Sequence, residues 1–143
     1  MYYIKISMKN TIFKLLEYLY YFSLVSLFIL YLFPGSVIGY YLYDNFGKQP
    51  DLISNPIGTS INHLISFICL SSLAFITRVR VRKFINSFQF LFFTSILLET
   101  LHYFIPNRAF EYYDLFANLA GVIIAYFFIQ LILKITIKKY ENI

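Results

Sequence analysis

Four long apolar stretches, separated by short polar segments, dominate the pattern of this chain. They run from about residue 12 to 33, 60 to 77, 84 to 105 and 113 to 133. A helix needs about 20 apolar residues to cross roughly 30 Å of hydrocarbon. The second stretch is short by this measure, so it either begins a turn earlier or crosses a locally thin bilayer. The pattern predicts four transmembrane helices in a single domain, residues 1–143.

The stretches are typical of helices rather than of membrane-spanning strands. Such strands alternate apolar and polar positions over about ten residues, whereas residues 96–98 and 122–128 do not alternate. The first stretch resembles a signal peptide, but it is long, and Phe33-Pro34-Gly35-Ser36 closes it without a clear cleavage site. We therefore expect an all-α, integral membrane four-helix bundle that retains its first helix.

The composition supports lipid as the solvent for this chain. Apolar residues make up 59% and charged residues 13%, against about 45–50% and 25% in soluble domains. The net charge of +5 could indicate nucleic acid, but the basic residues form short clusters between apolar runs, without an RNA-binding or zinc-finger motif. We therefore expect the bilayer as a partner and no nucleic acid. Cys69 is the only cysteine, so an intrachain disulfide is excluded.

The basic residues also predict the orientation. All of them except Lys48 and Arg108 fall before the first stretch or at its start, between the second and third, or at the end of the fourth. These are Lys5, Lys9, Lys14, Arg78, Arg80, Arg82, Lys83, Lys134, Lys138 and Lys139. Basic residues concentrate on the cytoplasmic side of membrane proteins. We therefore expect a multi-pass protein of the cell membrane with both termini in the cytoplasm.

The segment from Pro34 to Thr59 is then an outer loop. It is rich in the turn formers glycine and proline, including Pro50 and Pro56, and its tyrosines suit a membrane–water interface.

Several polar residues lie inside or beside the predicted helices at a similar depth. Ionisable residues within a membrane span are costly and mark candidate functional sites. The candidates for a polar pocket near the outer face are His63, Glu99, His102, Arg108, Asp114 and Asn118. The alternative is structural, because buried polar groups can also satisfy one another and fix helix packing.

The spacing of these residues favours convergence. Glu99 and His102 are three positions apart, and Asp114, Asn118 and Gly121 follow at intervals of four and three, so each set shares one helix face. Gly121 would let another helix approach closely. Arg108 lies in a loop, where we expect it to contact a ligand rather than to support helix packing.

The motifs Glu99-x-x-His102-x-x-x-Pro106-x-Arg108 and Asp114-x-x-x-Asn118-x-x-Gly121 resemble the pattern of VanZ-like membrane proteins. The resemblance spans roughly residues 30 to 130 and includes His63 at the start of the second helix and Pro34 after the first. It implies a cell-envelope protein, since some members are associated with teicoplanin resistance, but it implies no reaction.

This sequence departs from the family pattern at two places. Thr59 and Ser60 stand where the family often has an Asp–Lys pair, and His102 replaces the usual glutamine. A role that requires the Asp–Lys pair is therefore in doubt for this chain.

Three functions remain open. The first is binding of a lipid-linked or cell-wall ligand, with Arg108 gripping a phosphate or carboxylate. The second is a membrane enzyme in which Glu99 or Asp114 works with His63 or His102 in acid–base catalysis. The third and weakest is a transporter or channel, because four short helices without an inverted repeat make a poor monomeric transporter.

An enzyme is the less favoured interpretation, because no nucleophile stands out and the serine-hydrolase and P-loop motifs are absent. We expect no cofactor and no metal. Glu-x-x-His occurs once here, whereas di-iron bundles repeat it, and Leu98 precedes Glu99 where a zinc protease would have histidine. The oligomeric state is left open.

Overall fold

The computed structural model describes residues 2–49, 58 and 60–141, and every regular element in that part of the chain is helical. Single 3-10 turns, η1 and η2, flank the fourth α-helix. The elements are α1 (Tyr2–Leu32), α2 (Val37–Tyr43), α3 (Ser60–Arg78), η1 (Phe84–Asn86), α4 (Phe88–Leu101), η2 (His102–Phe104) and α5 (Tyr112–Glu141). The all-α prediction is confirmed for these residues.

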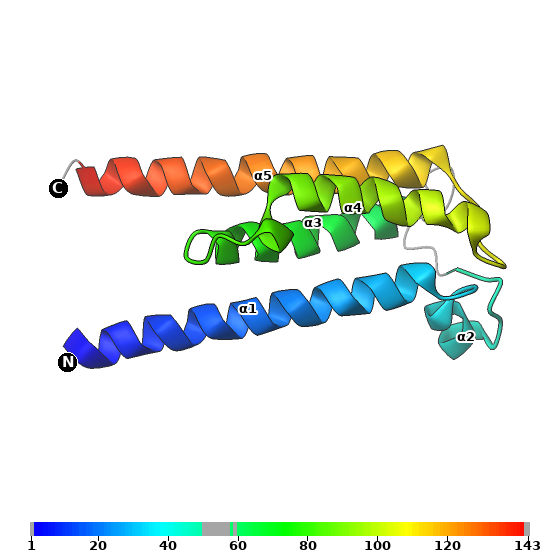
Figure 1. Ribbon diagram of the computed structural model, residues 1–143, viewed down its shortest axis with the longest axis horizontal. Coiled ribbons are helices and arrows are strands. Elements are labelled where there is room, and N and C mark those ends of the chain that lie inside the picture. The colour runs from blue at the N-terminus through cyan, green and yellow to red at the C-terminus, as the bar shows by residue number, and fades with distance from the viewer. Residues whose placement is uncertain (1, 50–57, 59, 142–143) are drawn as a thin grey trace.

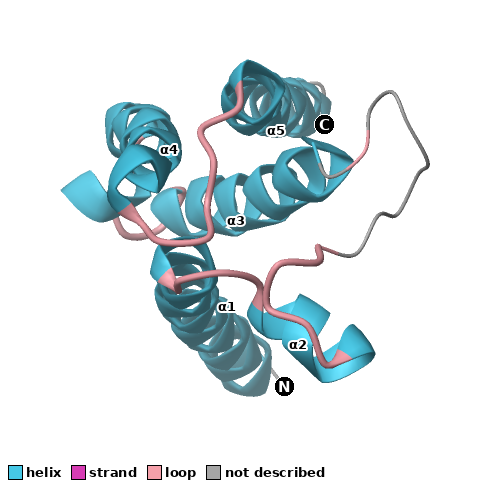
Figure 2. Cartoon of the chain, turned by 90° about the vertical axis from the view of Figure 1, so that its right-hand side faces the viewer, coloured by secondary structure: helices cyan, strands magenta, loops and turns pink. Residues whose placement is uncertain are grey.

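The four longer helices run along the long axis of the molecule (Figure 1). Seen end-on, α3 lies between α1 and α5, while α4 lies beside α5 and α2 sits next to α1 (Figure 2). The start of α1 and the end of α5 are at one end of the molecule, and the α3–α4 loop faces the same end but stops short of it (Figure 1). The short helix α2 and the α4–α5 loop are at the other (Figure 1).

Three helices are long and apolar enough to cross a membrane, over Asn10–Leu32, Ser60–Arg78 and Tyr112–Thr136. They correspond to the first, second and fourth predicted spans. Large apolar side chains such as Leu15, Phe22 and Phe127 are more than half exposed on their outer faces. Lipid is the solvent that suits such a surface.

The third predicted span, residues 84–105, is not one continuous helix. Ser87 adopts an extended backbone and caps α4, whose 14 residues end where η2 begins at His102. At 1.5 Å per residue α4 is about 21 Å long, short of roughly 30 Å of hydrocarbon. A fourth crossing therefore stays a prediction, and it would need the flanking 3-10 turns to complete it.

The outer loop contains a helix that the turn-rich pattern did not predict. Ser36 accepts a hydrogen bond from the backbone nitrogen of Gly39 and so caps α2. Gly39 packs so closely against Lys48 that a Cβ would lie 1.6 Å from its carbonyl oxygen. Only glycine fits there, which ties the helix to the loop. Pro50, Pro56 and Thr59, which belong to the same prediction, lie outside the described residues.

Close packing of α5 on α3 positions the polar side chains. A Cβ added to Gly121 would lie 2.8 Å from the carbonyl oxygen of Leu64 and 2.8 Å from the Cβ of Phe67. The absence of a side chain lets the two backbones approach, as small residues do in membrane helix pairs. Asp114 and Asn118 lie on the same stripe of α5, so this contact brings them against α3.

Candidate functional site

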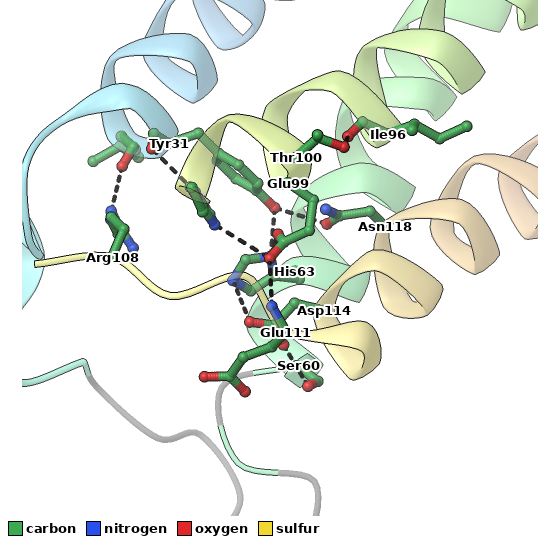
Figure 3. A network of polar contacts seen from close by, with 12 residues as sticks. Tyr31, Ser60, His63, Ile96, Glu99, Thr100, Arg108, Glu111, Asp114 and Asn118 are labelled. Carbon is green, nitrogen blue, oxygen red and sulfur yellow. Dashed lines mark hydrogen bonds and ion pairs between the residues drawn. The ribbon is translucent and has the colours of Figure 1, made fainter. Parts of the chain in front are cut away.

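Four buried polar residues from three helices meet near the end of the molecule that carries α2. They are His63 on α3, Glu99 on α4, and Asp114 and Asn118 on α5 (Figure 3). Glu99 and Asn118 are fully buried, and His63 and Asp114 are less than a tenth exposed. Burying such groups is costly unless they are paired, so their partners decide what the cluster can do.

His63 is the centre of the cluster. Its Nε2 lies 3.4 Å from Oδ2 of Asp114. Its Nδ1 lies 3.7 Å from Oε2 of Glu99 and 2.9 Å from the hydroxyl of Tyr31. The imidazole therefore lies between two carboxylates that come from different helices.

Tyr31 belongs to the site, although no pattern in the sequence distinguishes it. Its hydroxyl donates to Oδ1 of Asn118 at 2.8 Å, so the same oxygen accepts from Nδ1 of His63. The Tyr31 side chain is 8% exposed, which leaves the network as the environment of its hydroxyl. This contact makes the end of α1 a fourth wall of the cluster.

His102 ties Glu99 to α1. Its Nε2 is 3.2 Å from the carbonyl oxygen of Tyr31 and its Nδ1 is 3.2 Å from Oε1 of Glu99. Because a carbonyl oxygen only accepts, Nε2 carries a proton and donates it. The backbone nitrogen of Glu111 also donates to Oε1 of Glu99, at 3.1 Å. One oxygen of Glu99 is thus held from two sides.

The other oxygen of Glu99 and the amide nitrogen of Asn118 are buried and lack hydrogen-bond partners among the described residues. The carboxylates of the cluster also affect the pKa of the neighbouring residue Glu111. Burial raises the pKa of Glu111, and the nearby carboxylates of Asp114 and Glu99 raise it further. The cluster therefore has one unused acceptor, Oε2 of Glu99, and one unused donor, the amide nitrogen of Asn118, among the described residues.

Arg108 lies at the edge of the cluster and not within it. Its Nε donates to the carbonyl oxygen of Phe33 at 3.3 Å, and its Nη2 donates to that of Leu30 at 2.6 Å. The last carbonyls of a helix lack partners within the helix, and Arg108 supplies one to Leu30 in the last turn of α1 and another to Phe33 just after it. The expectation that this loop residue does not support the fold was therefore wrong.

Both departures from the VanZ-like pattern take part in the network, His102 as described above and Ser60 through Asp114. Ser60 donates a 2.5 Å hydrogen bond to Oδ1 of Asp114 (Figure 3). Thr59, which precedes it, lies outside the described residues. A sequence signal for Ser60 existed, since a hydroxyl three positions before His63 falls on the same helix face.

A cavity of about 400 Å³ adjoins the cluster. His63, His102 and Arg108 line it on the polar side. Its apolar lining comes from α1, α2 and α3, through Leu30, Val37, Ile38, Leu42 and Ile65. The cavity volume lies in the range of small-molecule sites, about 300–1,000 Å³.

The exposed apolar surface, the three long apolar helices and the buried polar cluster fit an all-helical membrane protein. The family model described as VanZ/LLP1 matches residues 3–133, and the chain belongs to that family. The resemblance drawn from the motifs is thereby confirmed. Comparison with curated proteins and with solved structures gave no match.

Proposed function

We propose that this VanZ/LLP1 protein binds a lipid-linked or cell-wall ligand of the bacterial envelope in the cavity beside His63. The observation that carries the proposal is the lining of that cavity. Apolar side chains form one part of it, and His63, His102 and Arg108 form another. An amphiphile with an anionic head matches it, because the head would meet Arg108 and the chain would lie along the apolar wall.

Arg108 can serve both the fold and the ligand. A guanidinium has five N–H donors in a fork that suits phosphate and carboxylate. The hydrogen bonds to Leu30 and Phe33 involve only Nη2 and Nε. Donors therefore remain for an anion, and the contacts with α1 hold the guanidinium in place for it.

The proposed orientation places this cavity at the outer leaflet. The basic α3–α4 loop lies toward one end of the molecule, and the starts of α3 and α5, which carry His63 and Asp114, lie toward the other (Figure 1). If the basic end is cytoplasmic, as the positive-inside rule requires, the ligand comes from the outer half of the bilayer. Glycopeptide sensitivity is then a suitable cellular readout, because these antibiotics act outside the membrane.

A substitution that fills the cavity tests this function. Ser66 lines the cavity from α3, and Cys69, one turn further along α3, is exposed and is not among the lining residues. Native mass spectrometry of the purified chain should detect a bound lipid in the wild type and in Cys69→Trp but not in Ser66→Trp. Teicoplanin sensitivity of cells expressing each variant should follow the same order. Equal lipid retention in both variants would contradict the proposal.

A second candidate is a membrane enzyme acting on an envelope lipid or glycan. It is favoured by two histidine–carboxylate contacts beside the cavity, His63 with Asp114 at 3.4 Å and His102 with Glu99 at 3.2 Å. Such pairs suit general acid–base catalysis. The test is incubation of the purified chain with extracted envelope lipids. Product formation that Glu99→Gln abolishes and Glu17→Gln leaves intact would favour the enzyme.

A further inference from the structure

We propose that His63, Glu99 and Asp114 form a binding site for a divalent cation. Each of these buried residues offers one ligand atom, and the three atoms all lie within 4.8 Å of one another. They come from α3, α4 and α5, so a bound ion would join three helices. The proposal is independent of the ligand proposed for the cavity.

The hydrogen bonds of the cluster leave one free atom on each of the three residues. Ser60 donates to Oδ1 of Asp114, while His102 and the backbone nitrogen of Glu111 contact Oε1 of Glu99. These bonds leave Oδ2 of Asp114 and Oε2 of Glu99. The latter is fully buried and lacks a hydrogen-bond partner in the described part of the chain, with Nδ1 of His63 at 3.7 Å.

The imidazole of His63 likewise has one hydrogen-bonded atom and one free atom. Nδ1 of His63 donates to the Tyr31 hydroxyl, because that hydroxyl donates its own proton to Asn118. Neutral histidine then has a lone pair on Nε2, and this lone pair faces Oδ2 of Asp114 at 3.4 Å. One ligand atom from each of His63, Glu99 and Asp114 lies within 4.8 Å of the other two, and a cation is the partner that such atoms attract.

The surrounding charges point the same way. Neither Glu99 nor Asp114 forms an ion pair with lysine or arginine among the described residues; their only such contacts are with His63 and His102. Arg108 directs its hydrogen bonds to α1 instead. Within the described part of the chain, no lysine or arginine therefore offsets the cost of burying these two carboxylates, and a divalent cation would neutralise both.

Each of the three residues is also hydrogen-bonded through the atom that would not bind the metal, and this arrangement is typical of metal sites. Metal-binding histidines usually hydrogen-bond through their second ring nitrogen, and ligating carboxylates are held in the same way. In this cluster Tyr31 contacts the second ring nitrogen of His63. Ser60 and the backbone nitrogen of Glu111 hold the second carboxylate oxygens of Asp114 and Glu99. Such an outer shell orients the ligands before the ion binds.

The donor set indicates which ion. One imidazole and two carboxylates suit Zn²⁺ or Mn²⁺, since imidazole favours the former and carboxylate oxygens the latter. Zinc ligands at about 2.1 Å lie roughly 3.4 Å apart in a tetrahedron. The 3.4 Å between Nε2 of His63 and Oδ2 of Asp114 already has this value. The other distances between ligand atoms, which are at most 4.8 Å, would shorten on metal binding through small rotations of the carboxylate side chains.

Three protein ligands leave a position open for water or for a ligand oxygen. His63 belongs to both the proposed metal site and the wall of the cavity. A phosphate or carboxylate in the cavity would therefore lie close to the ion.

Metal binding by the purified full-length chain in detergent tests the proposal. After treatment with a chelator and dialysis, Zn²⁺ or Mn²⁺ is added back, and retained metal is measured by mass spectrometry of the elements. We expect about one ion per chain and a higher melting temperature with metal, because an ion that binds only the folded state stabilises it. Glu99→Gln and Asp114→Asn should weaken binding at least about tenfold.

Glu17→Gln is the matched control. Glu17 is a carboxylate of α1 that pairs with Lys83 at 2.7 Å, away from the cluster. This variant should bind metal like the wild type. Absence of stoichiometric metal in the wild type would overturn the proposal even if the site variants fail to fold, and so would unchanged binding in Glu99→Gln. Either result would mean that protons on His63, and not a metal ion, balance the charge of the two carboxylates. Lipid retention in the cavity would be unaffected by that result, so the two proposals can fail separately.

Discussion

Ser60 and Asp114, 54 positions apart in the chain, are joined by a 2.5 Å hydrogen bond from the serine hydroxyl to Oδ1 of the aspartate. Ser60 opens α3 and Asp114 lies in the first turn of α5, so the bond links the starts of two adjacent helices. It also fixes the direction of the second carboxylate oxygen, Oδ2, toward His63.

This bond predicts the effect of Ser60→Ala. Loss of an orienting partner typically weakens metal affinity about 10- to 100-fold, and we expect a loss of that order for Zn²⁺ or Mn²⁺. Ser72→Ala, on the same helix but outside the cluster, is the control. The two variants should differ in a metal titration followed by melting temperature. Equal affinities would mean that Ser60 does not position Asp114.

Much of the site could be predicted because helical spacing is regular. Glu99 with His102, and Asp114 with Asn118 and Gly121, share faces by their intervals alone, and a polar stripe in an apolar helix must turn toward other protein.

The contribution of α1 could not be predicted in this way. Tyr31 lies near the end of a span, where tyrosine usually marks the membrane interface, and nothing in its neighbours distinguishes it from Tyr20 or Tyr21. Its role depends on the angle at which α1 meets α3, which is a property of packing. The break at Ser87 had a sequence signal that the span assignment passed over, since Asn86 and Ser87 interrupt the apolar stretch and serine is a preferred N-cap residue.

Arg108→Ala is expected to reduce stability as well as function. Hydrogen bonds that involve a charged group contribute about 1.5–3 kcal/mol, and this residue provides two for the end of α1. We expect a lower melting temperature together with loss of bound lipid.

Arg108→Lys separates these two roles. An ammonium can reach one carbonyl of α1 and recover part of the stability, but it cannot reproduce the guanidinium fork. Lipid retention should therefore remain low while the melting temperature partly recovers. Full lipid retention by both variants would exclude Arg108 from the ligand site.

Gly121→Leu should prevent close packing of α5 on α3. A Cβ alone would lie 2.8 Å from two atoms of α3, and overpacking of this kind costs about 1–3 kcal/mol. Protein abundance in the membrane and the melting temperature should both fall, and Gly121→Ala should give a smaller effect. Ala120→Leu is the control, because Ala120 borders a separate cavity of about 510 Å³ that can accept a larger side chain. Similar losses in both leucine variants would indicate a general intolerance of α5 and not a specific contact at Gly121.

The orientation of the chain can be tested by cysteine labelling, and the fold decides which positions to use. Lys48 lies in the loop beside α2, and Arg82 lies in the α3–α4 loop at the opposite end of the molecule (Figure 1). Arg82 is a better site than Lys83, because Lys83 is paired with Glu17. In a background with Cys69→Ala, a membrane-impermeant maleimide should label Lys48→Cys in intact cells and should label Arg82→Cys only after the membrane is opened. This order follows from the concentration of basic residues around the α3–α4 loop, since such clusters stay in the cytoplasm. Labelling of Arg82→Cys in intact cells would reverse the orientation and place the cavity beside His63 on the cytoplasmic side, where an outer-leaflet ligand could not reach it.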